Sequence, residues 1–364
     1  MSSPVALRAH FPVLETTAYL NAGTCGPLPA AALQAGADSA LAAAEEGRST
    51  AYYERLVEAR DGLRARYAER LGAAAPEDVA ITSSTSEGMA RVLTGLDLRS
   101  GDEIVTADDE HPGLLGPLSA ARRLRGITVK VVPLRVIDQH IGRRTKLVAC
   151  SHVHWATGEL APEGLANRPA GVPLLLDGAQ GAGAVPVDVG TLRCDFYAAA
   201  GQKWLCGPIG LGMLWISPAW QERLMAHMPT YPHLADPSAG LDARPWPDAR
   251  AHDAFATSAE ALIAGRASHD VLADAGWDSV MSRAAGLASD LAGELADRGH
   301  TVAPRGHTTL VSWRSDDPAE MVERCARHRV IVRSFPGLPW VRASVGAWND
   351  RGDIDRLLAA LGQS

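Results

Sequence analysis

A lysine in an uncharged, glycine-rich stretch is the residue best suited to covalent chemistry in this chain. Lys203 lies in Ala200-Gly-Gln-Lys-Trp-Leu-Cys-Gly-Pro-Ile-Gly210, and residues 196–215 contain no other charged side chain. A surface lysine is the ordinary alternative, but a neighbourhood without charge favours burial. Burial lowers the pKa of a lysine and makes its amine a good imine-forming nucleophile. We therefore predict that Lys203 is buried and functional.

An acidic residue closes an apolar stretch upstream of this lysine. In Leu174-Leu-Leu-Asp-Gly-Ala-Gln-Gly181, Asp177 follows three leucines. Ligands in open α/β sheets gather at the carboxyl ends of strands, where such a residue would lie. A carboxylate there can pair with a pyridinium nitrogen and keep it protonated, so that the ring acts as an electron sink. Spacing alone equally allows Asp177 to cap the following turn.

Small hydroxyl residues mark a third segment, Ile81-Thr-Ser-Ser-Thr-Ser-Glu-Gly-Met89, which follows one predicted strand and opens a helix. A helix N-terminus of this composition offers free backbone N–H groups, side-chain donors and a favourable dipole to a phosphate. An ordinary N-cap explains the same residues about as well.

The histidines give weaker signals. His111, in Asp108-Asp-Glu-His-Pro112, could stack on an aromatic cofactor and move protons near neutral pH, although a lone histidine after a strand is more often structural. His152 and His154 alternate on one face of a strand, as metal ligands can, but no third ligand lies nearby in sequence. We therefore expect no metal site.

Composition restricts the classes of protein to consider. The 364 residues are 46% hydrophobic and 21% charged, and no apolar run is long enough to span a membrane. The net charge of −7, without a basic block, argues against nucleic acid as a partner. The five cysteines are scattered and form no C-x-x-C pair, and the N-terminus carries no basic-then-apolar leader. These features are typical of a reduced, cytoplasmic protein.

Short apolar segments alternate with helix-forming stretches through the first two thirds of the chain, and a helix is predicted over Ala30–Leu71. Such alternation indicates an α/β fold with a mainly parallel sheet covered on both faces. The predicted strands are Val79–Thr82, Glu103–Thr106, Thr128–Val132, Lys146–Ser151, Pro173–Leu176, Asp195–Ala199 and Gly212–Ile216.

The pattern changes after Trp220. Met228–Asp253 is dense in Pro, Gly and Asp and is predicted to form a long loop, followed by a long helix over Ala259–Asp274. A small α+β lobe is then predicted from strands His307–Trp313 and Val330–Val332 and from helices Pro318–His328 and Asp350–Leu361. The predicted organisation is an arm over 1–15 packing on the small lobe, a large cofactor-binding domain over 16–255, and the long helix with a small C-terminal domain over 256–364.

Taken in order, these segments resemble the class V aminotransferase family, which includes cysteine desulfurases, selenocysteine lyases and isopenicillin-N-epimerase-like proteins. The matches run from Tyr19-Leu-Asn to Arg342-Ala-Ser. The most specific are Asp177-Gly-Ala-Gln180, Asp195-Phe-Tyr and Gly201-Gln-Lys-Trp-Leu-x-Gly-Pro208. The resemblance implies pyridoxal 5′-phosphate (PLP) as cofactor and fold type I of the PLP-dependent transferases, with a mainly parallel seven-stranded sheet and a smaller C-terminal lobe.

The resemblance also implies a role for each matching residue around the cofactor. Lys203 would bind PLP covalently and later move the substrate Cα proton, Asp177 would pair with the ring nitrogen, and His111 would stack over the ring. The ring hydroxyl oxygen and the phosphate would be held by Gln180, Thr85, Ser86 and Gln202. In this family a Gly-Thr element of the neighbouring subunit completes the phosphate site, and Ala256-Thr257 looks like its counterpart. This implies a homodimer with shared sites.

On the substrate side, the resemblance implies that Arg342 binds the carboxylate of an amino acid as a fork-shaped donor. Further substrate contacts are expected from Asn21, His154 and Trp155, with Tyr52 or Tyr53 beside them.

Three departures from the family pattern bear on the reaction. Between Val332 and Arg342 the chain lacks the loop cysteine on which desulfurases take up sulfur, and Cys325 lies earlier, in a predicted helix. Trp155 replaces the usual asparagine, so the ring oxygen loses a donor or the indole N–H takes over. Ala200 replaces a common phosphate-binding serine.

The expected function is therefore β-elimination on a cysteine-derived amino acid, a carbon–sulfur lyase reaction that yields pyruvate, ammonia and a thiol, in secondary metabolism. Epimerisation, transamination and oxidative decarboxylation of an amino acid stay open as alternatives, because the fate of the Cα electron pair depends on side-chain placement within about an ångström. A catalytically inactive scaffold would be free to lose Lys203, Asp177 or Arg342, and all three are present.

Overall fold

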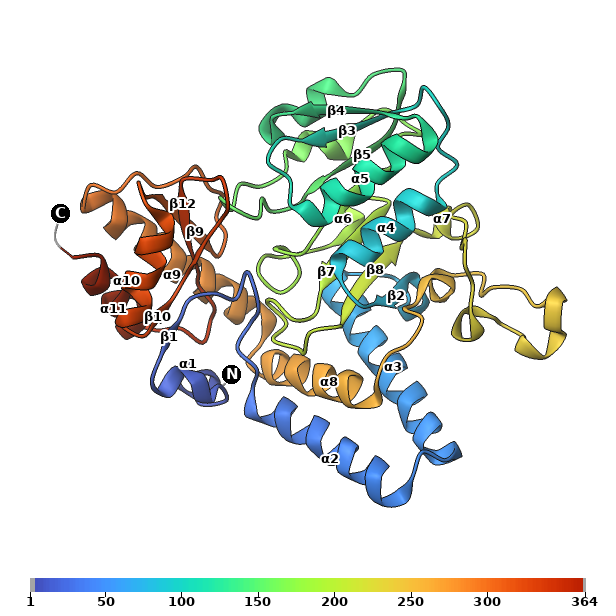
Figure 1. Ribbon diagram of the computed structural model, residues 1–364, viewed down its shortest axis with the longest axis horizontal. Coiled ribbons are helices and arrows are strands. Elements are labelled where there is room, and N and C mark those ends of the chain that lie inside the picture. The colour runs from blue at the N-terminus through green and yellow to red at the C-terminus, as the bar shows by residue number, and fades with distance from the viewer. Residues whose placement is uncertain (1–3, 363–364) are drawn as a thin grey trace.

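A seven-stranded sheet forms the centre of the larger lobe in the computed structural model, which describes residues 4–362 (Figure 1). The strand order is β2-β8-β7-β6-β5-β3-β4, and β8 alone runs antiparallel to its neighbours. The strands are β2 (Val79–Thr82), β3 (Glu103–Ala107), β4 (Thr128–Val132), β5 (Thr145–Ser151), β6 (Leu174–Asp177), β7 (Phe196–Ala200) and β8 (Gly212–Ile216). The predicted mainly parallel sheet is confirmed.

Helices cover both faces of this sheet because alternate strand residues are apolar on each side. Ile104 packs in a cluster with α4 (Thr85–Gly95) and α5 (Pro112–Arg125), whereas Val105 packs in a cluster with α3 (Thr50–Leu71). Near-continuous apolar strands are typical of sheets buried on both faces. The shorter elements of this lobe are η2 (Pro76–Asp78), η3 (Leu134–His140), η4 (Glu163–Asn167), α6 (Val189–Leu192), α7 (Pro218–Gln221), η5 (Tyr231–His233), η6 (Pro237–Asp242) and η7 (Ala249–His252).

The smaller lobe lies at the end of the long helix α8 (Ala259–Asp274) and has its own apolar core (Figure 1). Its antiparallel sheet has the order β11-β12-β9, and a parallel pair joins β1 to β10. The remaining elements are β1 (Ala18–Tyr19), β9 (Leu310–Arg314), β10 (Val330–Ile331), β11 (Arg333–Ser334), β12 (Trp340–Ser344), α9 (Trp277–Asp297), α10 (Pro318–Arg327) and α11 (Arg351–Leu361).

The N-terminal segment is attached to the smaller lobe. α1 (Pro4–Arg8) and η1 (Pro12–Glu15) precede β1, and the Arg8 guanidinium donates to Asp353 of α11 at 2.7 Å. β1 falls within the range predicted for the large domain, yet it pairs with β10 of the smaller lobe. Of the arm predicted over 1–15, residues 1–3 lie outside the described residues.

Two predicted segments differ in detail from the structure. The helix predicted over 30–71 is interrupted, because Gly47 adopts a positive φ of 76° and ends α2 (Ala30–Glu46) before α3 begins. The predicted long loop after Met228 contains only the short turns η5 to η7, and most of it extends away from the sheet as the yellow segment of Figure 1.

No helix within residues 4–362 is long and apolar enough to cross a membrane.

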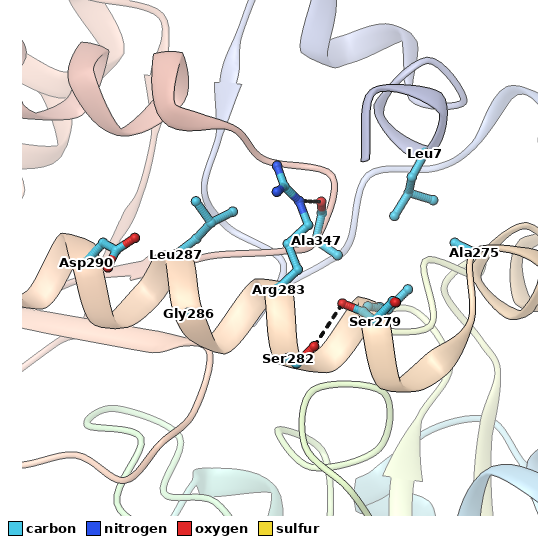
Figure 2. Close-up of a pocket in the computed structure, with 10 residues that line it drawn as sticks. Leu7, Ala275, Ser279, Ser282, Arg283, Gly286, Leu287, Asp290 and Ala347 are labelled. Carbon is cyan, nitrogen blue, oxygen red and sulfur yellow. Dashed lines mark hydrogen bonds between the residues drawn. The ribbon is translucent and has the colours of Figure 1, made fainter. Parts of the chain in front are cut away.

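A hollow of about 500 Å³ lies where α1, α9 and residues 345–350 meet (Figure 2). Leu7 faces it from α1, and Arg283 of α9 donates to the carbonyl oxygens of Ala347 and Asn349 at 2.9 Å each. These bonds fasten α9 to the segment that leads into α11. The hollow shares no lining residue with the pocket that contains Lys203.

A buried ion pair ties α3 to the chain that leads into α8. The Arg64 guanidinium donates to both oxygens of Asp253 at 2.9 and 2.7 Å and to the Val79 carbonyl. Asp253 also accepts from the Ile81 N–H at 2.8 Å, so one carboxylate joins α3, β2 and the turn η7.

We predict that Arg64→Leu lowers the free energy of unfolding by about 3–5 kcal/mol, because the Asp253 charge is left buried without its partner. Urea denaturation followed by circular dichroism measures the change. Arg99→Ala, which removes an exposed ion pair with Asp97, is the matched control and should leave stability unchanged. Equal stability of both variants would show that the buried pair does not hold these elements together.

Candidate active site

A pocket of about 200 Å³ lies between the two lobes at the carboxyl edge of the large sheet. Strands β3, β5, β6 and β7 each contribute a residue at or just after their carboxyl ends, and β11 and β12 contribute from the smaller lobe. The lining residues are Gly23, Thr24, Ser84, Thr85, Ser86, His111, Trp155, Asp177, Ala179, Gln180, Ala200, Gln202, Lys203, Arg333 and Arg342. Most of the residues predicted from the sequence are therefore brought together, whereas Asn21, His154 and Thr257 do not line the pocket.

Lys203 projects into this pocket beside one acidic group. Burial lowers the pKa of Lys203 to about 8, while the charge of Asp177 acts in the opposite direction and Arg342 and Arg333 act with burial. A lysine with a pKa near 8 is partly neutral at physiological pH, so its amine can act as a nucleophile or accept a proton.

Asp177 ends β6 and is 6% exposed, with Oδ1 accepting from the Ala179 N–H at 2.9 Å. Burial raises the pKa of this carboxyl, and the nearby Lys203 cation lowers it. Gln180 is held by two hydrogen bonds, because its amide donates to the Gly23 carbonyl at 2.8 Å and accepts from the Trp204 indole at 2.9 Å. One amide hydrogen of Gln180 stays available to a ligand.

The start of α4 offers the features that an anionic group requires. Ser84 is the N-cap and its Oγ accepts from the Glu87 N–H at 3.1 Å, which leaves the N–H groups of the first turn free of helical partners. The Thr85 Oγ1 and the Gln202 Oε1 are buried and have no hydrogen-bond partner among the described residues. Unpaired buried polar atoms are costly, so a phosphate that accepts from the Thr85 hydroxyl would satisfy one of these groups. The Gln202 Oε1 is itself an acceptor, so Gln202 could hold a phosphate only through the N–H groups of its amide.

His111 caps α5 with its own ring. Its Nδ1 accepts from the Gly113 N–H at 3.0 Å, which places the ring hydrogen on Nε2. Burial, together with the cations Lys203, Arg333 and Arg342, lowers the pKa of His111 to about 4. A ring that is neutral at physiological pH is suited to stacking, so this geometry favours the stacking role over proton transfer near neutral pH.

Trp155 forms an aromatic wall with its neighbours. Its ring meets His111 edge-on at 5.0 Å and Phe335 at 4.7 Å. The indole N–H donates to the Asp109 carbonyl at 2.6 Å, so it does not take over the role of the missing asparagine. The imidazole of His154 does not line the pocket, and it donates to the same Asp109 carbonyl at 3.1 Å.

Two arginines face each other at the small-lobe side of the pocket. Arg333 of β11 and Arg342 of β12 are opposite one another in the strand register. Arg342 is 1% exposed and donates to the Trp155 carbonyl and, at 3.5 Å, to the Thr24 hydroxyl. Arg333 donates to the same hydroxyl at 3.0 Å. Burial and the charge of Arg333 lower the pKa of Arg342 to about 9.

Neither guanidinium has a carboxylate within 4.0 Å among residues 4–362, and the buried Nε of Arg342 has no partner there. The Thr24 hydroxyl that both arginines contact donates to Asn21 Oδ1 at 2.7 Å. Asn21 therefore does not contact the arginines directly but orients the Thr24 hydroxyl that accepts from both of them. A site with two unneutralised guanidiniums is built for anionic groups.

The sequence interpretation missed Arg333, Thr24 and Gly23. An added Cβ at Gly23 would lie 2.8 Å from the Arg342 guanidinium, so only glycine leaves room for this arginine. The one available signal was that Arg333 and Arg342 flank a Phe-Pro-Gly turn, which predicts a hairpin with both side chains opposed.

The other candidates lie outside the pocket. Thr257 belongs to the segment just before α8. Tyr53 is 61% exposed and stacks edge-on with Tyr52. Cys325 is fully buried in the core of the smaller lobe, and His152 Nδ1 pairs with the Tyr197 hydroxyl at 3.0 Å.

Comparison with known proteins places this geometry in context. Residues 18–357 match the model of the aminotransferase class V family. A probable cysteine desulfurase of Pseudomonas aeruginosa is 31% identical over all of this chain and 99% of its own length. An isopenicillin N epimerase of Amycolatopsis lactamdurans is 32% identical over 54% of this chain and 52% of its own.

Two solved structures of the protein C-DES have the same fold. The cystine C–S lyase C-DES in complex with its reaction product cysteine persulfide superimposes with a TM-score of 0.87 at 29% identity, covering 96% of this chain and 98% of that one. A C-DES variant with glycine covalently linked to its PLP cofactor gives 0.88 at 27% identity, covering 98% and 99%.

We predict that the His111 ring stays neutral, with its hydrogen on Nε2, from pH 5 to pH 8. Nitrogen NMR of histidine-labelled protein measures this directly, and a His111→Asn variant identifies the signal. The unfolded protein in urea is the control, in which histidines titrate near ~6.5. A transition of the His111 signal between pH 6 and pH 7 would restore a proton-transfer role.

Proposed function

The chain belongs to the class V aminotransferase family of PLP-dependent enzymes, and from this we propose that it is a carbon–sulfur lyase. The proposed substrate is an amino acid that carries a sulfur substituent on Cβ. One molecule of substrate and one of water would give a thiol, pyruvate and ammonia. The carbon–sulfur bond breaks with its electron pair on sulfur, so no external oxidant or reductant takes part.

The pocket residues fit PLP as the cofactor. The buried, unpaired Thr85 hydroxyl at the start of α4 suits its phosphate as a hydrogen-bond donor, and the carboxylate of Asp177 suits a ring nitrogen. The residues that would hold PLP are Lys203 by a covalent bond, Asp177 at the ring nitrogen, His111 at the ring face, Gln180 at the ring hydroxyl, and Thr85, Ser86 and Gln202 at the phosphate.

When bound, PLP supplies an electron sink for the pair released as the substrate Cα–H bond breaks. Lys203 accepts that proton on Nζ, because its pKa of about 8 leaves a useful fraction of the amine neutral at pH 7–8. The charge of Asp177 would favour a protonated ring nitrogen in the same buried region. His111 covers the ring face as a neutral group, and Trp155 closes the pocket beside it.

The observation that carries the proposed function is the unneutralised pair Arg333 and Arg342. A simple amino acid has one carboxylate, whereas cystine carries one at each end of its disulfide. We assign the carboxylate of the reacting half to Arg342 and that of the leaving half to Arg333. With cystine the thiol released would be cysteine persulfide, which is the product named for C-DES.

The turn between β11 and β12 supports release of sulfur on a small molecule. Residues 335–339 are Phe-Pro-Gly-Leu-Pro, and Phe335 packs within 5.0 Å of the Arg342 guanidinium and 5.6 Å of that of Arg333. The turn holds no cysteine that could accept sulfur, and Cys325 is enclosed in the small-lobe core. Sulfur would therefore leave with the product.

We predict that the PLP-loaded protein converts cystine to equal amounts of pyruvate, ammonia and persulfide. Pyruvate is followed with lactate dehydrogenase, and persulfide by cyanolysis. Arg333→Met should raise KM for cystine by about ten-fold, the loss expected for one charge-assisted hydrogen bond, and change KM for S-methylcysteine far less.

Two outcomes would contradict this proposal. A spectral change on adding substrate without pyruvate would remove the lyase assignment and favour epimerisation, transamination or decarboxylation. Equal losses on both substrates in Arg333→Met would remove the second carboxylate site. Lys203→Ala is the control: it should lose the absorbance of covalently bound cofactor and the activity while keeping the wild-type circular dichroism.

We also propose that the protein is a homodimer with Thr257 of one subunit at the phosphate of the other. Large apolar side chains stand exposed on α2 and α3, among them Leu33 at 65%, Leu41 at 56% and Tyr53 at 61%. Exposed apolar groups of this kind favour association with another protein surface. The five cysteines are all free thiols, which supports a reducing compartment such as the cytoplasm.

Subunit mixing tests the shared site. We predict a particle of twice 38.4 kDa by light scattering, and Thr257→Ala should weaken PLP binding. Subunits with Lys203→Ala and subunits with Thr257→Ala, unfolded and refolded together at low PLP, should regain activity that neither has alone. The gain arises because a hybrid has one site with both residues intact. A monomer, or a mixture without gain, would place Thr257 outside the partner's site.

A further inference from the structure

A second buried carboxyl group lies beside Asp177 and has no role in the mechanism above. Glu110 follows β3, Ser151 ends β5 and Asp177 ends β6, and these three strands are adjacent in the sheet. Ser151 and Asp177 are paired in the strand register, so their side chains share one face of the sheet. Glu110 contacts Ser151 and thus adjoins the acid assigned to the cofactor nitrogen.

The environment of Glu110 suits a neutral acid. The side chain is 2% exposed, and no lysine or arginine lies within 4.0 Å of it among the described residues. Oε1 accepts from the Ser151 N–H at 2.7 Å, and Oε2 lies 2.5 Å from the Ser151 hydroxyl. In this arrangement the Ser151 hydroxyl donates to Oε2. A protonated carboxyl keeps both contacts when the hydroxyl turns to accept from the acid O–H while the other oxygen accepts from the amide.

Glu110 also belongs to the turn that presents the His111 ring. Asp109 adopts a φ of 53°, which is unusual for a residue other than glycine. Its carbonyl is held by the Trp155 indole and the His154 imidazole. The contacts of Glu110 with Ser151 complete this attachment, so the turn is fastened at residues 109 and 110 to the end of β5 and the residues that follow it.

We propose that Glu110 is a positioning residue that acts as a buried neutral acid. It fastens the His111 turn to β5, and it leaves Asp177 as the only carboxylate next to the cofactor site. Glu110 touches neither substrate nor cofactor and acts through Ser151 and His111.

The surrounding charges support this assignment. Burial raises the pKa of Glu110 to about 8, the hydrogen bonds from Ser151 act in the opposite direction, and the charge of Asp177 raises it further. The ionisable groups that face Glu110 are Asp177 on β6 and the Cys150 thiol on β5, and the backbone N–H of His111 also lowers the pKa of Glu110. Ionisation of Glu110 would place a second negative charge beside Asp177 and favour protonation of that acid.

The pH dependence of unfolding tests the buried neutral acid. Glu110 is ionised above ~4.3 in the unfolded chain but stays protonated in the folded chain up to about pH 8. The wild type therefore loses stability as pH rises through this window, and Glu110→Gln does not. The melting temperature of Glu110→Gln minus that of the wild type should increase from pH 5 to pH 8 and then stay constant.

Full-length protein is used with and without PLP, and Glu45→Gln, at an exposed glutamate, is the matched control that should show no such trend. A difference that is constant from pH 5 to pH 9 would overturn the proposal, because Glu110 would then not change its protonation on folding.

The positioning role is tested by rescue. Glu110→Ala should weaken PLP affinity by about ten-fold, the scale on which outer partners tune a site, and Glu110→Gln should recover most of that loss. The ratio of kcat/KM for Glu110→Gln to that of the wild type should be constant below pH 7 and rise above pH 8. Equal loss of PLP affinity in both variants would show that the ionised carboxylate is required.

These outcomes are separable from failure of the proposed function, because unfolding and PLP affinity need no sulfur substrate. Absence of pyruvate would remove the lyase assignment and leave the role of Glu110 intact.

Discussion

The electrostatic balance around Asp177 is the constraint on which the site depends. One buried carboxylate lies near three basic side chains, those of Lys203, Arg333 and Arg342, in the same pocket. Positive charge is thus in excess, and the excess lies where a phosphate and substrate carboxylates would enter. Burial keeps the His111 ring neutral, and the same excess of positive charge acts in the same direction. Because basic side chains outnumber carboxylates in the pocket, several of its hydrogen-bond donors have no salt-bridge partner among the described residues.

This balance depends on the placement of two lobes. The large sheet supplies Asp177, Lys203 and His111 from its carboxyl edge, whereas the arginines come from a two-residue strand and its partner in the smaller lobe. The first turn after β1 lies between them, where Thr24 contacts both guanidiniums and Gly23 accepts from Gln180. Movement of the smaller lobe would therefore change the charge in the pocket as well as its shape.

Much of the fold was predictable because apolar strands alternate with helices at regular intervals. The motifs around Asp177 and Lys203 were found from residue type alone, since an uncharged neighbourhood predicts burial. Arg333 was missed because its role arises from opposition across a hairpin, and arginines are abundant in this chain. The place of His154 was also unpredictable: its alternation with His152 was visible, but its hydrogen bond to the Asp109 carbonyl depends on a left-handed turn that sequence does not reveal. The break between α2 and α3 was missed because it depends on the positive φ of Gly47.

The absence of a side chain at Gly23 has a consequence for the comparison of homologous sequences. Because a methyl group there would meet the Arg342 guanidinium at 2.8 Å, the glycine and the arginine form one unit although they lie 319 positions apart in the chain. A homologue with a larger residue at this place must seat its arginine differently or have none. The pair can therefore indicate which uncharacterised relatives keep an arginine in this position for the carboxylate of an amino-acid substrate.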